Sequence, residues 1–172
     1  MSVDTAQFRE LYKAMYTPLF RIVKRITSNN DASEEIVQDT FIKVLDYWHK
    51  FETTDDARYW LIRVAQNAAI NWAKRSSKEY KLYQKAYSEQ HSAMASPEQV
   101  QLKTETEQLV QKALQILPEK FRQVLILKEY EELEYKEIGK VLGITEGNVK
   151  VRVFRAREAL ANALKELGYE VS

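Results

Sequence analysis

The sequence predicts an all-helical fold of two small helical domains joined by a linker. Only four glycines and three prolines interrupt the 172 residues. No stretch alternates apolar and polar residues as a half-buried strand would, whereas apolar residues recur at the three- and four-residue intervals of a buried helix face. We place the domains at residues 1–76 and 97–172, with the least patterned stretch, 77–96, as the linker.

The N-terminal domain is predicted to contain four helices. The first covers 4–16, and Thr17 followed by Pro18 is typical of an N-cap and a first helical residue, so a second helix is expected to restart there and run to 27. After a loop at 28–30, we expect a long helix over 31–51 and another over 57–76, which the polar loop 53–56 can cap.

Two exposed faces of this domain suggest function. The helix at 31–51 aligns acidic and amide side chains with one isoleucine, a strip that suits a partner but also fits plain solvated surface; its members are Glu35, Gln38, Asp39, Ile42 and Asp46. The helix at 57–76 aligns Arg63, Asn67, Asn71 and Lys74 near Tyr59 and Trp60. Cations beside aromatic rings suit single-stranded nucleic acid, although Trp60 and Trp72 also fit a role in the core.

The C-terminal domain is predicted to end in a helix-turn-helix. Ser96–Pro97 is expected to open a helix that ends near 117, and Leu117–Pro118 to start the next one. Residues 135–160 then form two helices around Gly143, which can adopt the positive φ of a sharp turn, while Thr145 can cap the second helix. This is the helix-turn-helix pattern, whose second helix can enter a DNA major groove.

The faces of that second helix separate cleanly. Its buried stripe is Val149, Val153, Ala156 and Leu160. The remaining surface carries cations, an amide and two apolar side chains that can read base edges, namely Asn148, Lys150, Val151, Arg152, Phe154 and Arg155. The alternative is a basic surface helix whose phenylalanine packs on another element.

The amino-acid composition excludes several classes of protein. The net charge of +1 argues against a protein that coats DNA through bulk charge, but it allows local basic patches. With no cysteine and only two separated histidines, we expect no disulfide, thiolate nucleophile, metal site or cofactor. No apolar run is long enough for membrane insertion, and the first residues lack the pattern of a secretory signal, so we expect an intracellular, soluble protein.

Three segments in order carry a family resemblance. SEEIVQDTFIKVLDYW, then RYWLIRVAQNAAINWAKR, then LPEKFRQVLILKEYEELEYKEIGKVLGITEGNVKVRVFRAREAL resemble a small extracytoplasmic-function (ECF, group 4) sigma factor of bacterial RNA polymerase. The resemblance implies that Glu35, Gln38 and Asp39 contact the polymerase. It implies contacts with minus-ten promoter DNA from Thr53, Thr54, Asp55, Asp56, Arg58, Arg63, Asn67, Asn71, Lys74 and Arg75. It also implies that Lys150, Val151, Phe154 and Arg155 read the minus-thirty-five element.

The expected function is therefore that of a sigma factor, which binds core RNA polymerase and directs promoter-specific transcription initiation without catalysis of its own. Its expected partners are core RNA polymerase, promoter DNA and an anti-sigma factor, and we expect a monomer when it is free. The alternatives are a stand-alone helix-turn-helix regulator, a protein-binding adaptor, and a helical nuclease with a metal held by Glu52, Asp55 and Asp56.

Overall fold

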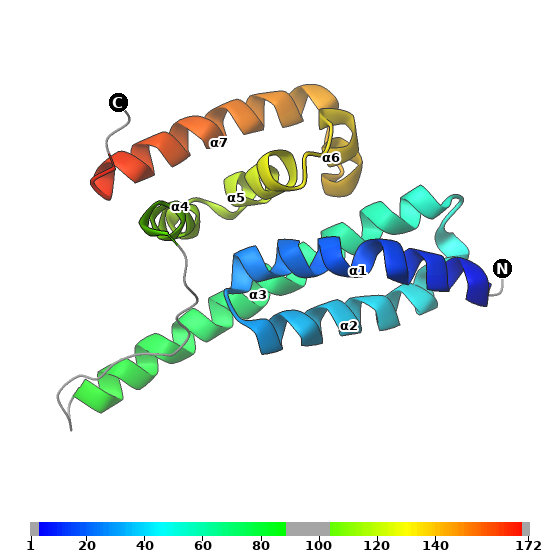
Figure 1. Cartoon of the computed structure of the whole chain (residues 1–172), viewed down its shortest axis with the longest axis horizontal. Coiled ribbons are helices and arrows are strands. Elements are labelled where there is room, and N and C mark those ends of the chain that lie inside the picture. The colour runs from blue at the N-terminus through cyan, green and yellow to red at the C-terminus, as the bar shows by residue number, and fades with distance from the viewer. Residues whose placement is uncertain (1–3, 89–103, 170–172) are drawn as a thin grey trace.

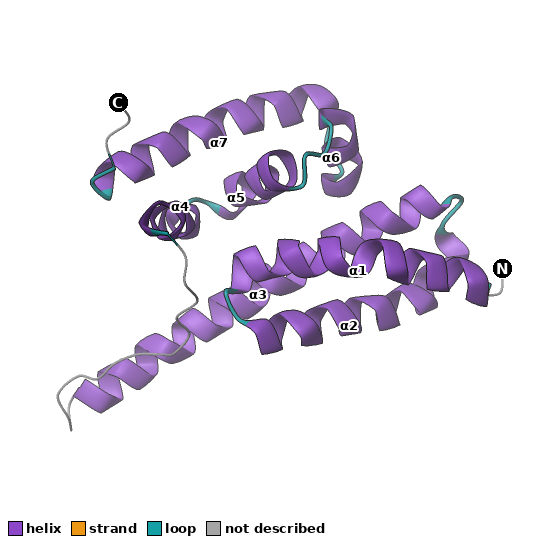
Figure 2. Ribbon diagram, viewed as in Figure 1, coloured by secondary structure: helices purple, strands orange, loops and turns teal. Residues whose placement is uncertain are grey.

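The computed structural model describes residues 4–88 and 104–169, and all regular elements in these ranges are helices (Figure 2). The N-terminal half contains α1 (Thr5–Thr27), α2 (Asn30–Tyr47), the short 3-10 helix η1 (Trp48–Lys50) and α3 (Thr54–Ser88). The C-terminal half contains α4 (Glu105–Ile116), α5 (Glu119–Leu125), the π-helical turn η2 (Ile126–Tyr130), α6 (Tyr135–Leu142) and α7 (Glu146–Glu166). The all-helical prediction is confirmed. Within the described ranges, no helix has both the length and the apolar character needed to cross a membrane.

The predicted break at Thr17–Pro18 is wrong, because α1 passes through Pro18 without interruption. Proline lacks the N–H that would donate to the carbonyl four residues earlier, so a helix interior normally disfavours it. Here Met15 and Leu19 on either side are both buried in one continuous stripe of the helix. Burial of that stripe offsets the lost hydrogen bond, and the actual N-cap is Asp4, which accepts from the backbone N–H of Ala6 at 2.9 Å.

Helix α3 is longer than predicted at both ends. It was expected over 57–76 but begins at Thr54 and runs to Ser88, so residues 77–88, expected in the linker, are helical. Figure 1 shows this C-terminal part of α3 projecting beyond the other helices. The remaining linker residues and the Ser96–Pro97 helix start lie outside the described residues, and the structure places the N-cap of α4 at Thr104.

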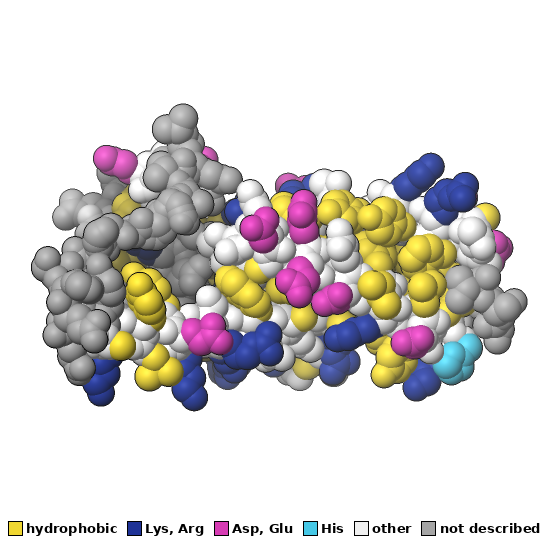
Figure 3. Space-filling view, turned by 90° about the horizontal axis from the view of Figure 1, so that it is seen from below, with side chains coloured by type: hydrophobic (Ala, Val, Ile, Leu, Met, Phe, Trp, Pro, Cys, Tyr) yellow, Lys and Arg dark blue, Asp and Glu magenta, His cyan; other side chains and the backbone are white. Residues whose placement is uncertain are grey.

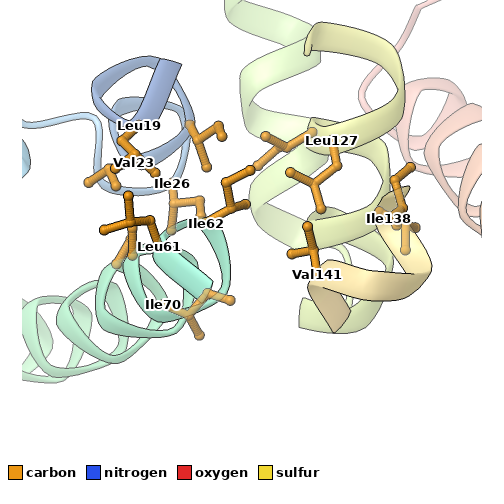
Figure 4. Packing of buried hydrophobic residues seen from close by; sticks show 14 of the residues in the cluster. Leu19, Val23, Ile26, Leu61, Ile62, Ile70, Leu127, Ile138 and Val141 are labelled. Carbon is orange, nitrogen blue, oxygen red and sulfur yellow. The ribbon is translucent and has the colours of Figure 1, made fainter. Parts of the chain in front are cut away.

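Helices α1, α2 and α3 pack against one another, and the C-terminal half lies against α1 and α3 (Figure 1). Buried residues of both halves form one continuous apolar cluster. Figure 4 shows Ile26 and Ile62 of the N-terminal half lying toward Leu127 and Val141 of the C-terminal half. All four side chains are at most 3% exposed, so parting the halves would bring apolar surface into water.

Polar contacts also join the two halves. The Arg21 guanidinium donates to the Glu131 carboxylate at 2.8 Å, and this hydrogen bond raises the pKa of Arg21 above its usual value. The Arg25 guanidinium lies 3.4 Å from the centre of the Tyr130 ring, within range of a cation–π interaction. The Gln111 side-chain N–H donates to the Arg25 carbonyl at 2.7 Å. These contacts fix η2 and α4 against the C-terminal end of α1.

Candidate nucleic-acid and partner interfaces

The helix-turn-helix forms as predicted from α6 and α7. Gly143 ends α6 with φ of 71°, in the left-handed region, and its N–H donates to the Gly139 carbonyl at 2.8 Å. The hydroxyl of Thr145 accepts from the backbone N–H of Asn148 at 3.1 Å, which confirms it as the N-cap of α7. Both ends of the turn are thus fixed by local hydrogen bonds.

The crossing of α6 and α7 depends on a glycine that the sequence analysis did not single out. A Cβ atom at Gly139 would lie 2.7 Å from the backbone carbonyl oxygen of Ile144, closer than real Cβ atoms approach. Gly139 is itself buried, so the turn is pressed directly against the α6 backbone. A glycine in the middle of a short predicted helix is the one sequence signal that could have indicated this contact.

The outward face of α7 is open to solvent. Val149, Val153 and Ala156 are at most 1% exposed, as predicted, while Leu160 is only half-buried. On the other side Val151 is 49% and Phe154 66% exposed, which rules out the alternative that Phe154 packs on another element. Asn148, Lys150 and Arg155 are also exposed, and Arg152 is half-buried. In Figure 1, α7 lies on the side of the molecule away from α2.

The acidic and amide strip on α2 is likewise exposed. Glu35, Gln38 and Asp39 all face solvent, and Ile42 beside them is 63% exposed. Figure 3, which views this face of the molecule, shows acidic side chains at its centre with a hydrophobic area next to them. Exposed carboxylates that border exposed apolar surface are better suited to a protein partner than to DNA, because phosphates repel carboxylates.

The loop before α3 caps the N-terminus of that helix. The Thr53 hydroxyl accepts from the backbone N–H of Asp56 at 3.1 Å, and the Asp56 carboxylate accepts from the backbone N–H of Thr53 at 3.3 Å. The Arg58 guanidinium donates to the Asp55 carboxylate at 2.9 Å. These bonds explain the acids at 55 and 56 without a metal, and among the described residues no group of three or more acidic or histidine side chains could hold a metal ion.

A small cavity of about 150 Å³ lies beside this loop, lined by Trp48, Phe51, Thr53 and Thr54. Trp60 is half-buried, and the centre of its ring lies 5.2 Å from that of Tyr47 and 5.8 Å from that of Phe51. It therefore does not offer this cavity an unoccupied ring face on which a base could stack.

The structure separates the predicted minus-ten residues of α3 into two groups. Asn71 and Arg75 line a groove with Glu35 and Asp39 of α2, so the predicted DNA and polymerase contacts meet there. Trp72 lines the same groove and is half-buried against the core.

The second group, Arg63, Asn67 and Lys74, faces the C-terminal half. The Asn67 side-chain oxygen accepts from the Gln123 amide at 3.3 Å, and the Lys74 ammonium lies 2.5 Å from the Glu119 carboxylate. A Cβ atom on Gly143 would be 3.6 Å from the Arg63 guanidinium. The three residues nevertheless stay exposed, so the C-terminal half contacts the edge of the face that was predicted to meet DNA without burying it. No sequence signal indicates these contacts.

Comparison with known proteins identifies the class. Residues 11–79 match the family described as Sigma-70 region 2, and residues 107–160 match the family described as Sigma-70, region 4. Among relatives, the chain is 30% identical over 149 residues to the RNA polymerase sigma factor YlaC of Bacillus subtilis, with 86% of each chain covered. It is 28% identical to the ECF RNA polymerase sigma factor SigW of the same organism, with 95% of this chain and 92% of the relative covered.

Solved structures share the fold. The sigma factor RpoE of Bartonella quintana, in complex with the anti-sigma factor NepR, has a TM-score of 0.64 at 24% identity, covering 92% of this chain and 96% of that one. CnrH, in complex with the cytosolic domain of CnrY, also has a TM-score of 0.64, at 20% identity, covering 92% of this chain and 88% of that one. The chain belongs to the ECF family of RNA polymerase sigma factors, the proteins of promoter-directed transcription initiation.

Proposed function

We propose that this chain is a dissociable specificity subunit that brings core RNA polymerase to its promoters. The observation that carries the proposal is the presence, on one chain, of an open reading face on α7 and an acidic, partly apolar strip on α2. The α2 strip of Glu35, Gln38 and Asp39 docks on the polymerase. The α7 face enters the major groove at the minus-thirty-five element.

The loop 53–56 and α3 act at the minus-ten element. The cavity beside Thr53 and Thr54 has the size of a small planar group and the polar rim that an extruded base needs. Asn71 and Arg75 lie next to the α2 strip, so DNA bound there is held close to the polymerase. Arg63, Asn67 and Lys74 are exposed beside the C-terminal half, and DNA that binds there replaces the contacts of Asn67 with Gln123 and of Lys74 with Glu119.

Two weak DNA contacts suffice because the polymerase holds both halves on one assembly, which raises the effective concentration of each contact. This accounts for a net charge of only +1. All bond-forming chemistry belongs to the polymerase, and the protein works where the polymerase does, in the bacterial cytoplasm. An anti-sigma factor is the expected regulator, since the fold neighbour RpoE is solved in complex with the anti-sigma factor NepR, and CnrH in complex with the cytosolic domain of CnrY.

Run-off transcription on genomic fragments of the source bacterium tests the proposal, comparing its core polymerase with and without the protein. We expect discrete start sites that need both components, and co-elution of the protein with core. A variant in which Glu35 and Asp39 become Ala should lose co-elution, whereas Glu10→Ala and Glu166→Ala, at exposed positions elsewhere, should keep it. Tight DNA binding without polymerase, with no new start sites, would instead support a stand-alone regulator.

A further inference from the structure

The projecting end of α3 carries a line of cations of which the proposed function uses only the first, Lys74. Lys74, Lys78, Lys81 and Lys85 follow one another at intervals of four, three and four residues, which keeps them on one face of the helix. They cover about 16 Å along the helix at 1.5 Å per residue. We call them the lysine stripe. Figure 3 shows cationic side chains along the edge of the molecule where α3 projects.

The lysine stripe continues the face of α3 that carries the minus-ten residues. Arg63, Lys74 and Lys85 are spaced by eleven residues, which is about three full turns of an α-helix. Asn67 lies one turn after Arg63, and Lys78 lies one turn after Lys74. Because α3 is a single helix from Thr54 to Ser88, a partner that lies along its first part is directed along the stripe as well.

Two lysines of the stripe, Lys78 and Lys81, lie where the described residues offer little compensating negative charge. A cavity of about 380 Å³ between α3 and the C-terminal half is lined by Lys74, Lys78, Lys81 and Arg122, with Glu119 as its one carboxylate. Burial lowers the pKa of Arg122, whose guanidinium donates to backbone carbonyls at the end of α4 rather than to an acid. In the part of the chain that the structure describes, Lys78 and Lys81 have no ion-pair partner.

The composition of the stripe favours duplex DNA over a protein partner or a single strand. Lysine is depleted at the centre of protein interfaces, whereas lysine and arginine supply most contacts to phosphates. A single strand would need aromatic rings on the same face for base stacking. Turning 100° per residue places Tyr80 and Tyr83 well away from the stripe, on other sides of α3.

We propose that the lysine stripe binds the backbone phosphates of duplex promoter DNA flanking the minus-ten element. This inference rests on the proposed function, because it takes α3 to lie on promoter DNA. The stripe extends the DNA contact beyond the length of helix that the sequence had assigned to the N-terminal domain, and it adds affinity that does not depend on base sequence.

The test measures how salt weakens the binding of holoenzyme to a promoter fragment mapped by run-off transcription. Each lost phosphate contact should reduce the slope of log K against log salt by about 0.9, so Lys78→Ala with Lys81→Ala should flatten it by about 1.8. Alanine favours helix, so this variant should fold. Lys78→Arg with Lys81→Arg should keep the wild-type slope, because it keeps both charges. The matched control, Lys13→Ala with Lys112→Ala, removes two exposed lysines away from the stripe and should also keep it.

An alanine variant with the wild-type slope refutes this inference alone, provided that the holoenzyme still starts at the mapped promoter. A slope that flattens equally in the control also refutes it, because the effect would then be one of net charge. If no start site requires the protein, the proposed function fails and this inference fails with it. Methylphosphonate linkages, which are uncharged, in the duplex flanking the minus-ten element should remove the difference between wild type and the stripe variant.

Discussion

Replacing Gly139 by alanine sets two physical effects against each other. Alanine has the higher helix propensity, which alone would stabilise α6 by about 1 kcal/mol. Against this, the new Cβ would lie 2.7 Å from the Ile144 carbonyl oxygen, which belongs to the backbone and cannot rotate away. Relieving such an overlap in a packed interior costs about 1–3 kcal/mol, and a rigid backbone contact falls toward the upper end. We therefore expect a net loss of about 1–2 kcal/mol.

Thermal unfolding followed by circular dichroism measures this loss. For a chain of 172 residues, 1 kcal/mol corresponds to about 2–4 °C in Tm, so Gly139→Ala should lower Tm by roughly 2–8 °C. Gly147→Ala is the matched control in the same motif, because a Cβ there meets nothing within 4 Å. Propensity alone acts on it, and its Tm should rise by about 1–4 °C.

The steric argument predicts Tm changes of opposite sign for the two substitutions. If both substitutions raise Tm, the turn does not press on α6 as closely as the structure places it, and the steric argument is refuted. If both lower Tm, the loss is not specific to the contact between Gly139 and Ile144.

Three further predictions concern the interface and the recognition helix. Glu119→Lys replaces the exposed ion pair with Lys74 by two cations, an effect on the order of 1 kcal/mol, which should shift the equilibrium between closed and open halves about fivefold toward the open state. Energy transfer between dyes on cysteines introduced into the two halves should then fall. The control Glu166→Lys, which makes the same charge change elsewhere, should leave it unchanged. Phe154→Ala should leave Tm and core co-elution unchanged, because the ring is 66% exposed, but should cut run-off product tenfold or more; an unchanged yield contradicts its role in reading DNA. Thr145→Ala should cost about 1 kcal/mol in urea unfolding through loss of the α7 N-cap, which Thr145→Ser should restore; equal losses for both would exclude capping as the cause.

The contact between the two halves engages residues of the predicted minus-ten surface. Asn67 accepts from the Gln123 amide and Lys74 pairs with Glu119, although both residues stay exposed, whereas Val151 and Phe154 on the predicted reading face of α7 lie open to solvent. DNA that binds Asn67 and Lys74 would therefore compete with these two contacts. Polymerase or a regulator that prefers one arrangement of the halves would alter that competition.

The sequence by itself determined the local structure and the family. Gly143 and Thr145 act through backbone conformation and a hydrogen bond three residues away, so their roles follow from neighbours in the chain. The faces of α7 and α2 follow from helical periodicity, which is also local. The order of the three motifs indicated the ECF sigma-factor family. The specific contacts of the site residues remain predictions.

Only the tertiary structure decided which faces meet. Pro18 stays inside α1 because burial on both sides of it outweighs a local preference, and no window of sequence reports that balance. Gly139 touches a carbonyl brought back by the turn, and Lys74 meets Glu119 across the interface of the two halves. Contacts between residues far apart in the chain depend on the packing of whole helices, whereas capping and periodicity act within a turn or two.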